Sequence, residues 1–417
     1  IRQAWKRKKR GRTFLARNIQ EEEEEGPGVG EQAQKVSLRP GGWTMNLSLS
    51  FCPRFPQSSP SLKSLVVVLM PLPSPVNSNG SVMTWGRGKS GQLGHGDSEN
   101  QLQPKVVELL KDTVIRSVAA GWNHSGFVSD IGCLYTCGDG SYGQLGHGDY
   151  ETQSLPLKVL YFNSKHVAQV TFGMRHSLVL LEGPPGELVY SFGSARHGQL
   201  GVAVEKGFRS YNLPQVVNGF GEDHITVICA NGDQSAALSG EGHLYTWGRG
   251  FGGTSNIPVP QLLTSHLAFS QVALGWNHAL LLTCMLPATT SNQFSNIVMD
   301  SDTGEVFMLV GARHGKFSGS EFKNLESVGA VPHMHDITAL YGLKATMIAA
   351  GAEHSVLVSE CGDIMSWGWG EHGQLGLGGT CDQATPQIVR ICNRPSNSSI
   401  SFRVYCGSGF TFTVGAT

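Results

Sequence analysis

Charged residues are scarce in this sequence, and the motifs of several common enzyme classes are absent. Asp, Glu, Lys and Arg make up 15% of the 417 residues, and the formal net charge is −1. A near-neutral chain lacks the overall electrostatic field expected of a protein that binds nucleic acid or a membrane surface. There is no P-loop, no Gly-x-Ser-x-Gly and no His-Glu-x-x-His phrase. P-loop nucleotide chemistry, serine-hydrolase chemistry and zinc-peptidase chemistry therefore have no support.

Long apolar runs and paired metal-ligand motifs are also missing. The longest apolar run, residues 65–72, is far shorter than the roughly 20 residues that span a bilayer. The nine cysteines are scattered, and Cys133 and Cys137 have no second pair at zinc-ligand spacing. We interpret them as reduced thiols of an intracellular protein, in the cytoplasm or the nucleus. We expect no cofactor, no metal and no small-molecule substrate.

Two histidines are a weak metal candidate. His333 and His335 lie two residues apart beside Asp336, so they could share one face of a strand. No third ligand accompanies them, and we expect a surface loop rather than a metal site.

Residues 1–79 do not resemble the rest of the chain. They combine a basic run, the acidic run Glu21–Glu25 and a Ser/Pro-rich stretch over residues 52–64. This composition predicts a disordered tail, or translated sequence that is not native to the protein. The basic run is a candidate nuclear-import signal or a candidate phosphate-binding arm. Any contact with chromatin would be made through this arm only. The alternative is a run of charges that is simply solvated. It comprises Lys6, Arg7, Lys8, Lys9 and Arg10.

Glycine is abundant from residue 80 onward, and it recurs in fixed phrases. The chain has 54 glycines, about 13% against roughly 7% in average proteins. An aromatic-Gly position followed by Gly-Gln-Leu-Gly returns at steps of 52, 55, 55, 62 and 58 residues, with decayed copies near residues 253 and 315. A period near 55 indicates an array of structural repeats.

A second phrase, Gly-x-x-His between apolar residues, precedes each unit. Short β-branched and aromatic runs bounded by glycine, such as residues 117–121 and 124–130, predict three or four strands per unit. Sheets of this size bury both faces when they stack radially, so we predict an all-β protein, a β-propeller over residues 80–417. A proline precedes an apolar strand in most units.

The repeated residues are interpreted as structural. Glycines permit tight corners and close approach of sheets, leucines fill the space between blades, and histidines bond to backbone at a turn. The residues are Gly86, Gly91, Leu93, Gly94, Gly121, His124, Gly138, Gly143, Leu145, Gly146, Gly173, His176, Gly193, Gly198, Leu200, Gly248, Gly275, His278, Gly351, His354, Trp367, Gly368, Gly373 and Leu375.

These phrases resemble the repeat of the regulator-of-chromosome-condensation family, over about residues 80–417. Members usually form propellers of seven blades. Here five whole units begin near residues 118, 170, 227, 272 and 347, and residues 80–94 and 404–414 form an outer and an inner half. The halves could share one blade and close the ring, which gives six blades. Either one blade is missing, or residues 62–72 supply its strands.

The resemblance implies a regulatory protein that acts by binding other proteins. Guanine-nucleotide exchange on a small GTPase is the leading specific function, and a scaffold or adaptor without exchange activity is the alternative. Exchange needs no covalent chemistry, only tighter binding of the nucleotide-free GTPase. The family's exchange residues lie outside the repeat phrases, so none can be assigned here.

Candidate interaction residues are those that depart from the repeat. The distance from His278 to the next turn glycine, Gly304, is 26 residues instead of 8, and the extra segment over residues 284–301 contains Asn292 and Phe294. Such insertions map to surface loops, where they bind partners or are simply tolerated. Trp122 and Trp276 are candidate rim aromatics or packing residues.

A remote alternative implied by the resemblance is ultraviolet-B sensing. The plant photoreceptor of this fold uses Gly-Trp-Arg-His phrases in neighbouring blades, with tryptophans clustered across a dimer face. Here Asn123 and Asn277 replace the arginines, and the two Gly-Trp-Asn-His units are not adjacent. We therefore do not expect a stacked tryptophan group.

Overall fold

The computed structural model describes residues 82–183, 188–203, 209–250, 255–284, 304–310, 333–391 and 401–416. The chain divides into two compact units, Ile1–Gln34 and Lys35–Thr417. All of the described residues belong to the second unit. The expected tail over residues 1–79, with its basic run, lies outside the described residues and stays a prediction.

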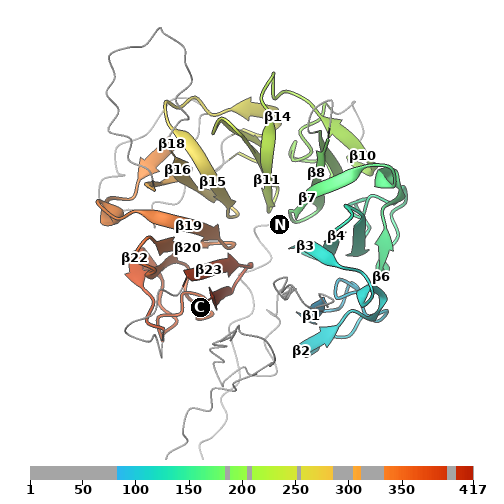
Figure 1. Ribbon diagram of the computed structural model, residues 1–417, viewed down its shortest axis with the longest axis horizontal. Coiled ribbons are helices and arrows are strands. Elements are labelled where there is room, and N and C mark those ends of the chain that lie inside the picture. Colours follow the sequence, from blue (N-terminus) through green and yellow to red (C-terminus); the bar gives the residue numbers. More distant parts are fainter. Residues whose placement is uncertain are drawn as a thin grey trace, which may run out of the picture. The chain divides into compact units, whose positions relative to one another are not determined.

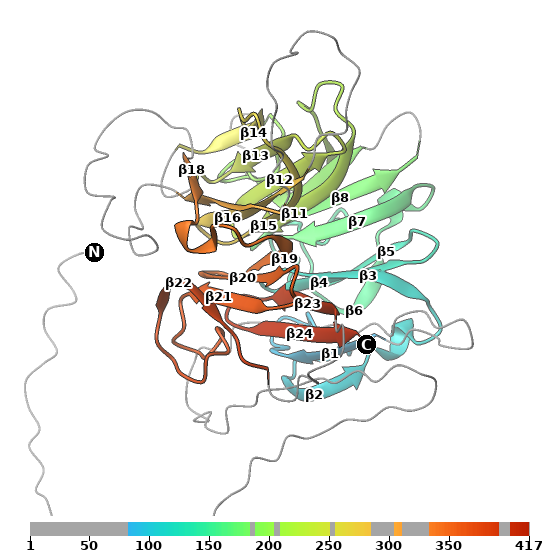
Figure 2. The same ribbon diagram turned by 60° about the vertical axis from the view of Figure 1, so that its left-hand side comes forward.

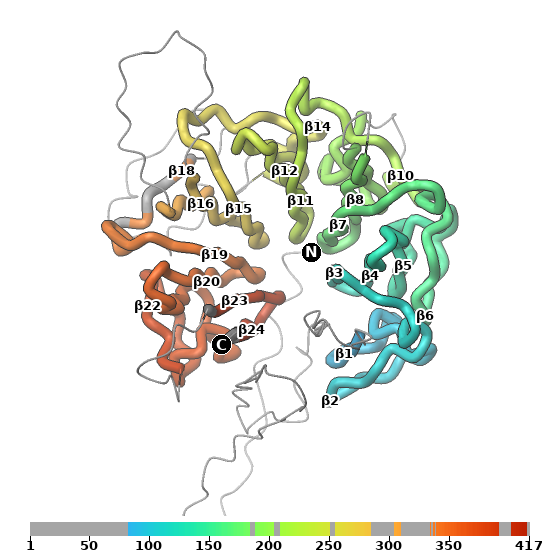
Figure 3. Tube along the Cα trace, in the orientation of Figure 1, coloured from blue at the N-terminus to red at the C-terminus, as the bar shows by residue number. Residues whose placement is uncertain are grey.

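The described residues form five four-stranded antiparallel sheets, which we call blades 1 to 5 and which surround a common axis (Figures 1 and 3). Within each blade the strands follow one another in chain order, so neighbours in sequence are hydrogen-bonded neighbours. Blade 1 contains β3 (Ile115–Ala120), β4 (His124–Ser129), β5 (Leu134–Gly138) and β6 (Gln153–Lys158). Blade 2 contains β7 (His166–Phe172), β8 (His176–Glu182), β9 (Val189–Ser194) and β10 (Ser210–Val217).

The remaining blades repeat this order. Blade 3 contains β11 (Ile225–Asn231), β12 (Gln234–Ser239), β13 (Leu244–Gly248) and β14 (Ile257–Leu262). Blade 4 contains β15 (Ala268–Leu274), β16 (His278–Cys284), β17 (Val306–Val310) and β18 (His333–Asp336). Blade 5 contains β19 (Ala345–Ala350), β20 (His354–Ser359), β21 (Ile364–Gly368) and β22 (Gln383–Ile388). Three short 3₁₀ turns occur in the described residues: η1 (Glu108–Leu110), η2 (Leu160–Phe162) and η5 (Thr338–Leu340).

Two half-blades complete the described fold. They are β1 (Met83–Gly86) with β2 (Gln101–Val106), and β23 (Ser401–Cys406) with β24 (Thr411–Ala416). Figure 2 shows β24 beside β1, and the rings of Trp85 and Phe412 meet edge to face with centroids 6.2 Å apart. Within the described residues β1 and β24 remain in separate sheets. The predicted all-β propeller of five whole units and two halves is confirmed, and its halves meet through side chains.

The apolar core is divided among the junctions between consecutive sheets. Phe192 lies in the cluster between blades 1 and 2, Trp247 in that between blades 2 and 3, and Trp367 in that between blades 4 and 5. Each is the aromatic residue of an aromatic-Gly phrase, and it packs toward the preceding blade. A buried aromatic ring removes roughly 150–250 Å² from water, worth about 4–6 kcal/mol before the entropy cost. The repeated aromatic-Gly phrase therefore reflects the same packing contact at these three junctions between blades.

Two local expectations need correction. The recurrent proline does not precede a strand but lies inside the outermost strand of its sheet, as Pro156 does in β6 and Pro386 in β22. An outermost strand tolerates proline because the missing N–H faces no neighbour. Residues His333–Asp336, expected in a loop, form the outermost strand β18 of blade 4.

Candidate functional site

Two sets of connections meet at one end of the propeller. The turn between the first two strands of a blade carries the Gly-x-x-His phrase, and the loop after the third strand carries the Gly-Gln-Leu-Gly element. Antiparallel pairing places His124 opposite Gly138, so both connections leave the sheet at the same end. The amide of Asp139 donates to the carbonyl oxygen of Asn123 at 2.8 Å. We call this end the Gly-x-x-His rim, and the other end the opposite rim.

A repeated hydrogen bond links neighbouring blades beneath this rim. Nε2 of His124 lies 3.2 Å from the hydroxyl of Ser177 in the next blade, and that hydroxyl donates to the carbonyl oxygen of Gln144 at 2.6 Å. Because the hydroxyl proton is used, the imidazole N–H must donate to the hydroxyl oxygen. The corresponding contacts are His176–Ser235 at 2.8 Å, His278–Ser355 at 3.0 Å and His354–Thr411 at 3.0 Å.

The glycine of each phrase makes room for the imidazole. A Cβ atom on Gly121 would lie 2.5 Å from Cε1 of His124 and 2.7 Å from the carbonyl oxygen of Gly173. Gly173, Gly275 and Gly351 are blocked by their own histidines in the same way. The three-residue spacing is therefore a packing requirement, since the ring occupies the space of the missing side chain.

Burial keeps these imidazoles neutral. Loss of solvation lowers the pKa of His124, His278 and His354 to about 4 and that of His176 to about 3, from an ordinary 6.5. Among the described residues, Nδ1 of His124, His176 and His354 has no hydrogen-bond partner. Protonation would therefore bury an N–H with no acceptor, which opposes it further. This geometry fits a structural role for these histidines and not proton transfer. Their expected partner needs correction, because Nε2 bonds to a hydroxyl group of the next blade and not to backbone at the turn.

Blade 3 departs from the phrase, and the structure corrects its alignment by one residue. Residues 230–239 are a degenerate copy of the Gly-x-x-His phrase. When this copy is aligned with the other units by sequence, Gly232 takes the glycine position and Ser235 takes the histidine position. In the structure Ser235 pairs with Trp247, and its hydroxyl hydrogen-bonds Nε2 of His176. Ser235 is therefore the residue after the histidine position, so that Gln234 occupies the histidine position and Asn231 the glycine position. In blade 3, where an amide replaces the imidazole, the glycine position three residues earlier accommodates the side chain of Asn231.

The interblade contact is lost together with the histidine. At the blade 3–4 junction the residue that corresponds to Ser177 is Ala279. Both amide atoms of Gln234 are buried and have no hydrogen-bond partner among the described residues. Histidine and hydroxyl are thus present as a pair at four junctions and absent as a pair at this one.

The loops of this rim are rigid because the Gly-Gln-Leu-Gly element folds back on itself. The amide oxygen of Gln144 accepts from the backbone N–H of Tyr142 at 2.8 Å, and Gln199 does the same for His197. Leu145 is buried, and its carbonyl oxygen accepts from the hydroxyl of Thr136 at 2.8 Å. Gly143 and Gly146 have φ of 78°, a conformation that favours glycine. The backbone of these loops is consequently held by hydrogen bonds within the loop and to the adjacent strand.

Trp122 and Trp276 meet at this rim, although they belong to blades 1 and 4. Their ring centroids are 5.3 Å apart and their planes are tilted by 40°. A Cβ atom on Gly232 would lie 3.3 Å from Cδ1 of Trp276, so this glycine leaves room for the indole. No stacked tryptophan group is expected from the sequence, since the two units are not adjacent; the two rings nevertheless form one tilted contact, because blades that are not adjacent along the ring approach each other near its axis.

Three rim residues were missed by the sequence analysis. The guanidinium carbon of Arg175 lies 4.9 Å from the ring centroid of Tyr142, and that of Arg196 lies 5.7 Å from the same centroid. Arg175 and Tyr142 are half-buried and Arg196 is exposed. All three stand at variable positions inside the repeated phrases, where no repeat pattern distinguishes them from other surface residues.

The other candidate interaction residues belong to the connection between β16 and β17. Asn292 and Phe294 lie outside the described residues. The ends of their segment, Cys284 and Gly304, flank the connection from β16 to β17. That connection leaves blade 4 at the opposite rim, because β16 starts at the Gly-x-x-His rim with His278. The two sets of candidates therefore require separate tests.

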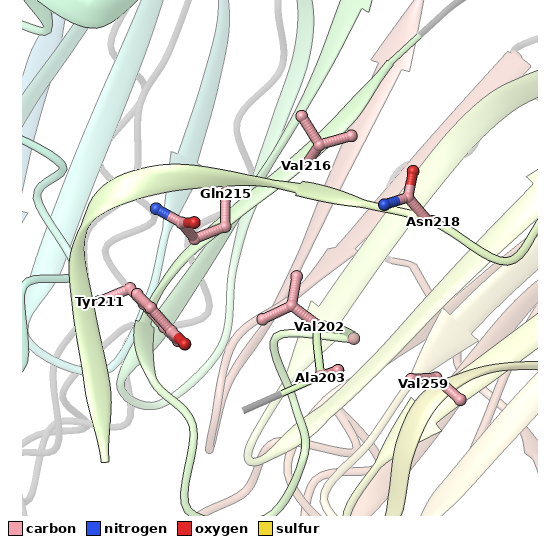
Figure 4. Close-up of a pocket in the computed structure, with 8 residues that line it drawn as sticks. Val202, Ala203, Tyr211, Gln215, Val216, Asn218 and Val259 are labelled. Atoms are coloured by element: carbon pink, nitrogen blue, oxygen red, sulfur yellow. The ribbon is translucent and has the colours of Figure 1, made fainter. Parts of the chain in front are cut away.

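A pocket of about 350 Å³ lies at the outer side of blades 2 and 3 (Figure 4). Val202, Val216 and Val259 supply apolar surface, and Tyr211 and Gln215 supply polar groups. It forms where β10 departs from regular pairing with β9. Within the described residues its lining contains no carboxylate, histidine or basic side chain, and no three His, Cys, Asp or Glu residues are grouped to hold a metal ion. No described helix is long and apolar enough to cross a membrane.

A family model for the RCC1-like domain matches residues 75–413. The chain belongs to this family. Mouse secretion-regulating guanine nucleotide exchange factor is 28% identical over 376 residues, which cover 81% of this chain and 73% of that protein. The ultraviolet-B receptor UVR8 of Arabidopsis thaliana is 29% identical, with 80% and 70% covered. Human E3 ubiquitin-protein ligase HERC2 is 31% identical over 67% of this chain, which spans 5% of that protein.

Solved structures share the fold of this RCC1-like chain. Saccharomyces cerevisiae Prp20p, described with its binding to Gsp1p and histones, matches with a TM-score of 0.61 and 24% identity over 81% of this chain and 78% of that one. Human WBSCR16 matches with a TM-score of 0.62 and 24% identity over 81% of each chain. The resemblance to the regulator-of-chromosome-condensation family is thus confirmed, together with its propeller fold.

The tryptophan contact bears on the photoreceptor alternative. Trp122 and Trp276 belong to blades 1 and 4, which are not adjacent, yet their rings are in contact. Asn123 and Asn277 occupy the positions at which the photoreceptor phrase has arginine. A single tryptophan pair inside one rim also differs from a cluster across a dimer face.

Proposed function

We propose that this RCC1-like propeller binds a small GTPase at its Gly-x-x-His rim and promotes exchange of the bound guanine nucleotide. The observation that carries the proposal is the rim itself, where Trp122, Trp276, Tyr142 and two arginines stand on a rigid frame. Tryptophan, tyrosine and arginine are the residues that most often carry the binding energy of protein interfaces. The compartment we expect is the cytoplasm or the nucleus.

The comparisons support exchange as the specific activity. The exchange factor of mouse is matched over 73% of its length, so the shared region is most of that protein. Exchange requires that the propeller bind the nucleotide-free GTPase more tightly than the loaded one. Any such preference must come from surface contacts, because no bond is made or broken.

The test uses purified small GTPases in nucleotide-free, GDP-loaded and GTP-loaded form. We expect one of them to bind the full chain most tightly when nucleotide-free and to release fluorescent GDP faster when the chain is added. Equal binding of all three forms without faster release would support the scaffold alternative. That alternative has its own observation, since in HERC2 the matching region is a small part of a longer chain.

Removing the tryptophan pair should abolish this binding. For Trp122→Ala with Trp276→Ala we expect a loss of about 30-fold or more, because hot-spot truncations cost about 2–4 kcal/mol. Tyr341→Ala is the matched control: Tyr341 is a 74% exposed aromatic residue between β18 and β19 at the opposite rim. Affinity is measured by biolayer interferometry, with urea unfolding to confirm that each variant folds. An unchanged affinity in the tryptophan variant would place the GTPase elsewhere.

A further inference from the structure

Two arginines share one aromatic ring at the Gly-x-x-His rim, and neither is neutralised by the described part of the chain. Arg175 and Arg196 both lie within 6 Å of the centroid of Tyr142, at 4.9 and 5.7 Å. In the same described residues Arg116 and Arg249 have carboxylate partners, whereas Arg175 and Arg196 have none within ion-pair distance. Two positive charges that contact one ring favour a nearby anion, which would lower their mutual repulsion.

The three residues stand on backbone that hydrogen bonds hold in place. The backbone N–H of Tyr142 is held by Gln144, and the carbonyl oxygen of Arg175 accepts from the amide of Ser194 at 2.8 Å. Arg196 stands in the loop that Gln199 closes through His197. A site whose parts are held before binding loses little conformational entropy when the ligand arrives.

An apolar surface adjoins the arginines. The backbone N–H of Trp122 donates to the carbonyl oxygen of Gly173 at 3.3 Å, two residues before Arg175. Trp122 in turn contacts Trp276, and the half-buried Met174 stands between Gly173 and Arg175. Cationic and apolar recognition are therefore next to each other on one surface.

We propose that Arg175, Arg196 and Tyr142 bind a carboxylate of an acidic protein segment, and that an apolar side chain of the same segment packs on the Trp122–Trp276 pair. A guanidinium pair matches the two oxygens of a carboxylate. A nucleic acid fits less well, because binding its backbone takes many phosphate contacts and this chain carries a net charge of −1. The proposal does not depend on nucleotide exchange, since it concerns any partner that presents such a segment.

The experiment pans a random peptide library, displayed on phage, against the full chain. The selected peptides are then synthesised and their affinities measured by fluorescence anisotropy, with a single-stranded oligonucleotide as a second probe. We expect enrichment of Asp or Glu beside an aromatic or aliphatic residue. Arg175→Gln with Arg196→Gln should weaken those peptides at least about tenfold, the equivalent of one charge-assisted contact.

The controls separate this site from general charge effects. Arg390→Gln with Arg403→Gln also removes two exposed positive charges, one just after β22 and one in β23, and should leave the affinity unchanged. Arg196→Gln alone, at an exposed position, should weaken binding partly and guards against a folding defect in the double variant. The proposal is overturned if the selected peptides are not acidic, or if they bind the double variant as well as the parent chain. Oligonucleotide binding that is tighter than peptide binding and lost in the double variant would assign the site to a phosphate backbone instead.

Discussion

Replacing Gly121 by alanine is expected to lower the free energy of unfolding by about 3 kcal/mol. The new methyl group would overlap the imidazole of His124 and the carbonyl oxygen of Gly173 at once. That oxygen accepts from the backbone N–H of Trp122, so it cannot move away freely. Overpacking of a filled site costs about 1–3 kcal/mol, and more when backbone must shift. Urea unfolding followed by circular dichroism measures the change.

Two further variants test the cause of this loss. Gly379→Ala should change stability by less than about 0.5 kcal/mol, because nothing lies within 4 Å of a Cβ at Gly379. His124→Gln copies the amide that blade 3 has at Gln234, and in combination with Gly121→Ala it should remove the overlap with the imidazole, although not that with the carbonyl oxygen of Gly173. The double variant should therefore be more stable, by at least about 1 kcal/mol, than the sum of the two single losses predicts. Simple additivity would show that the ring is not what excludes the side chain.

The blades were predictable because each one repeats the same local solution. A glycine that admits an imidazole and an aromatic residue that packs toward the preceding blade leave marks at fixed spacing, as at Gly173 and Trp247. The register of blade 3 was not predictable from these marks. Gly232 imitates the phrase glycine, and the pairing of Ser235 with Trp247 and its hydrogen bond with His176 show that the register is shifted by one residue.

The candidate site was less predictable than the fold, because it depends on distances between blades. Trp122 and Trp276 are separated by 154 positions and two intervening blades, and sequence order says nothing about contacts across the axis. Tyr142 and Arg175 stand at variable positions of different blades, where no pattern marks them. In the sequence, Tyr142 and Arg175 look like ordinary surface residues. Only the structure shows that the two loops bring their side chains together.

The histidines and the variable residues of the phrase therefore have separate tasks. The buried pair His124–Ser177 holds two blades together, while Trp122 and Asn123, between the glycine and the histidine, are half-buried at the rim. A change in the variable residues alters what the rim can bind without altering the frame. The frame residues can therefore recur from blade to blade while the residues between them differ.

Stability should fall steeply as the pH drops from 6.5 toward 4. Burial lowers the pKa of His124, His176, His278 and His354 in the folded chain to about 3 or 4, whereas the unfolded value is 6.5. In this window the unfolded chain binds more protons, so unfolding is favoured as pH falls, and the stabilisation is fully present above pH 6.5. Four protons correspond to about 5 kcal/mol per pH unit near pH 5. A domain of ordinary stability would unfold within the window.

The blade 3–4 junction supplies the variant that isolates the histidine contribution. His176→Gln with Ser235→Ala reproduces the Gln234–Ala279 pair at the junction of blades 2 and 3. It removes one of the four imidazoles, so the slope of unfolding free energy against pH should decrease by about 1.4 kcal/mol per pH unit near pH 5. Urea midpoints measured between pH 4 and pH 8 give both slopes. A stability that is flat below pH 6.5, or an identical slope in the variant, would mean that these imidazoles accept protons without unfolding and that the interblade hydrogen bonds do not require the neutral ring.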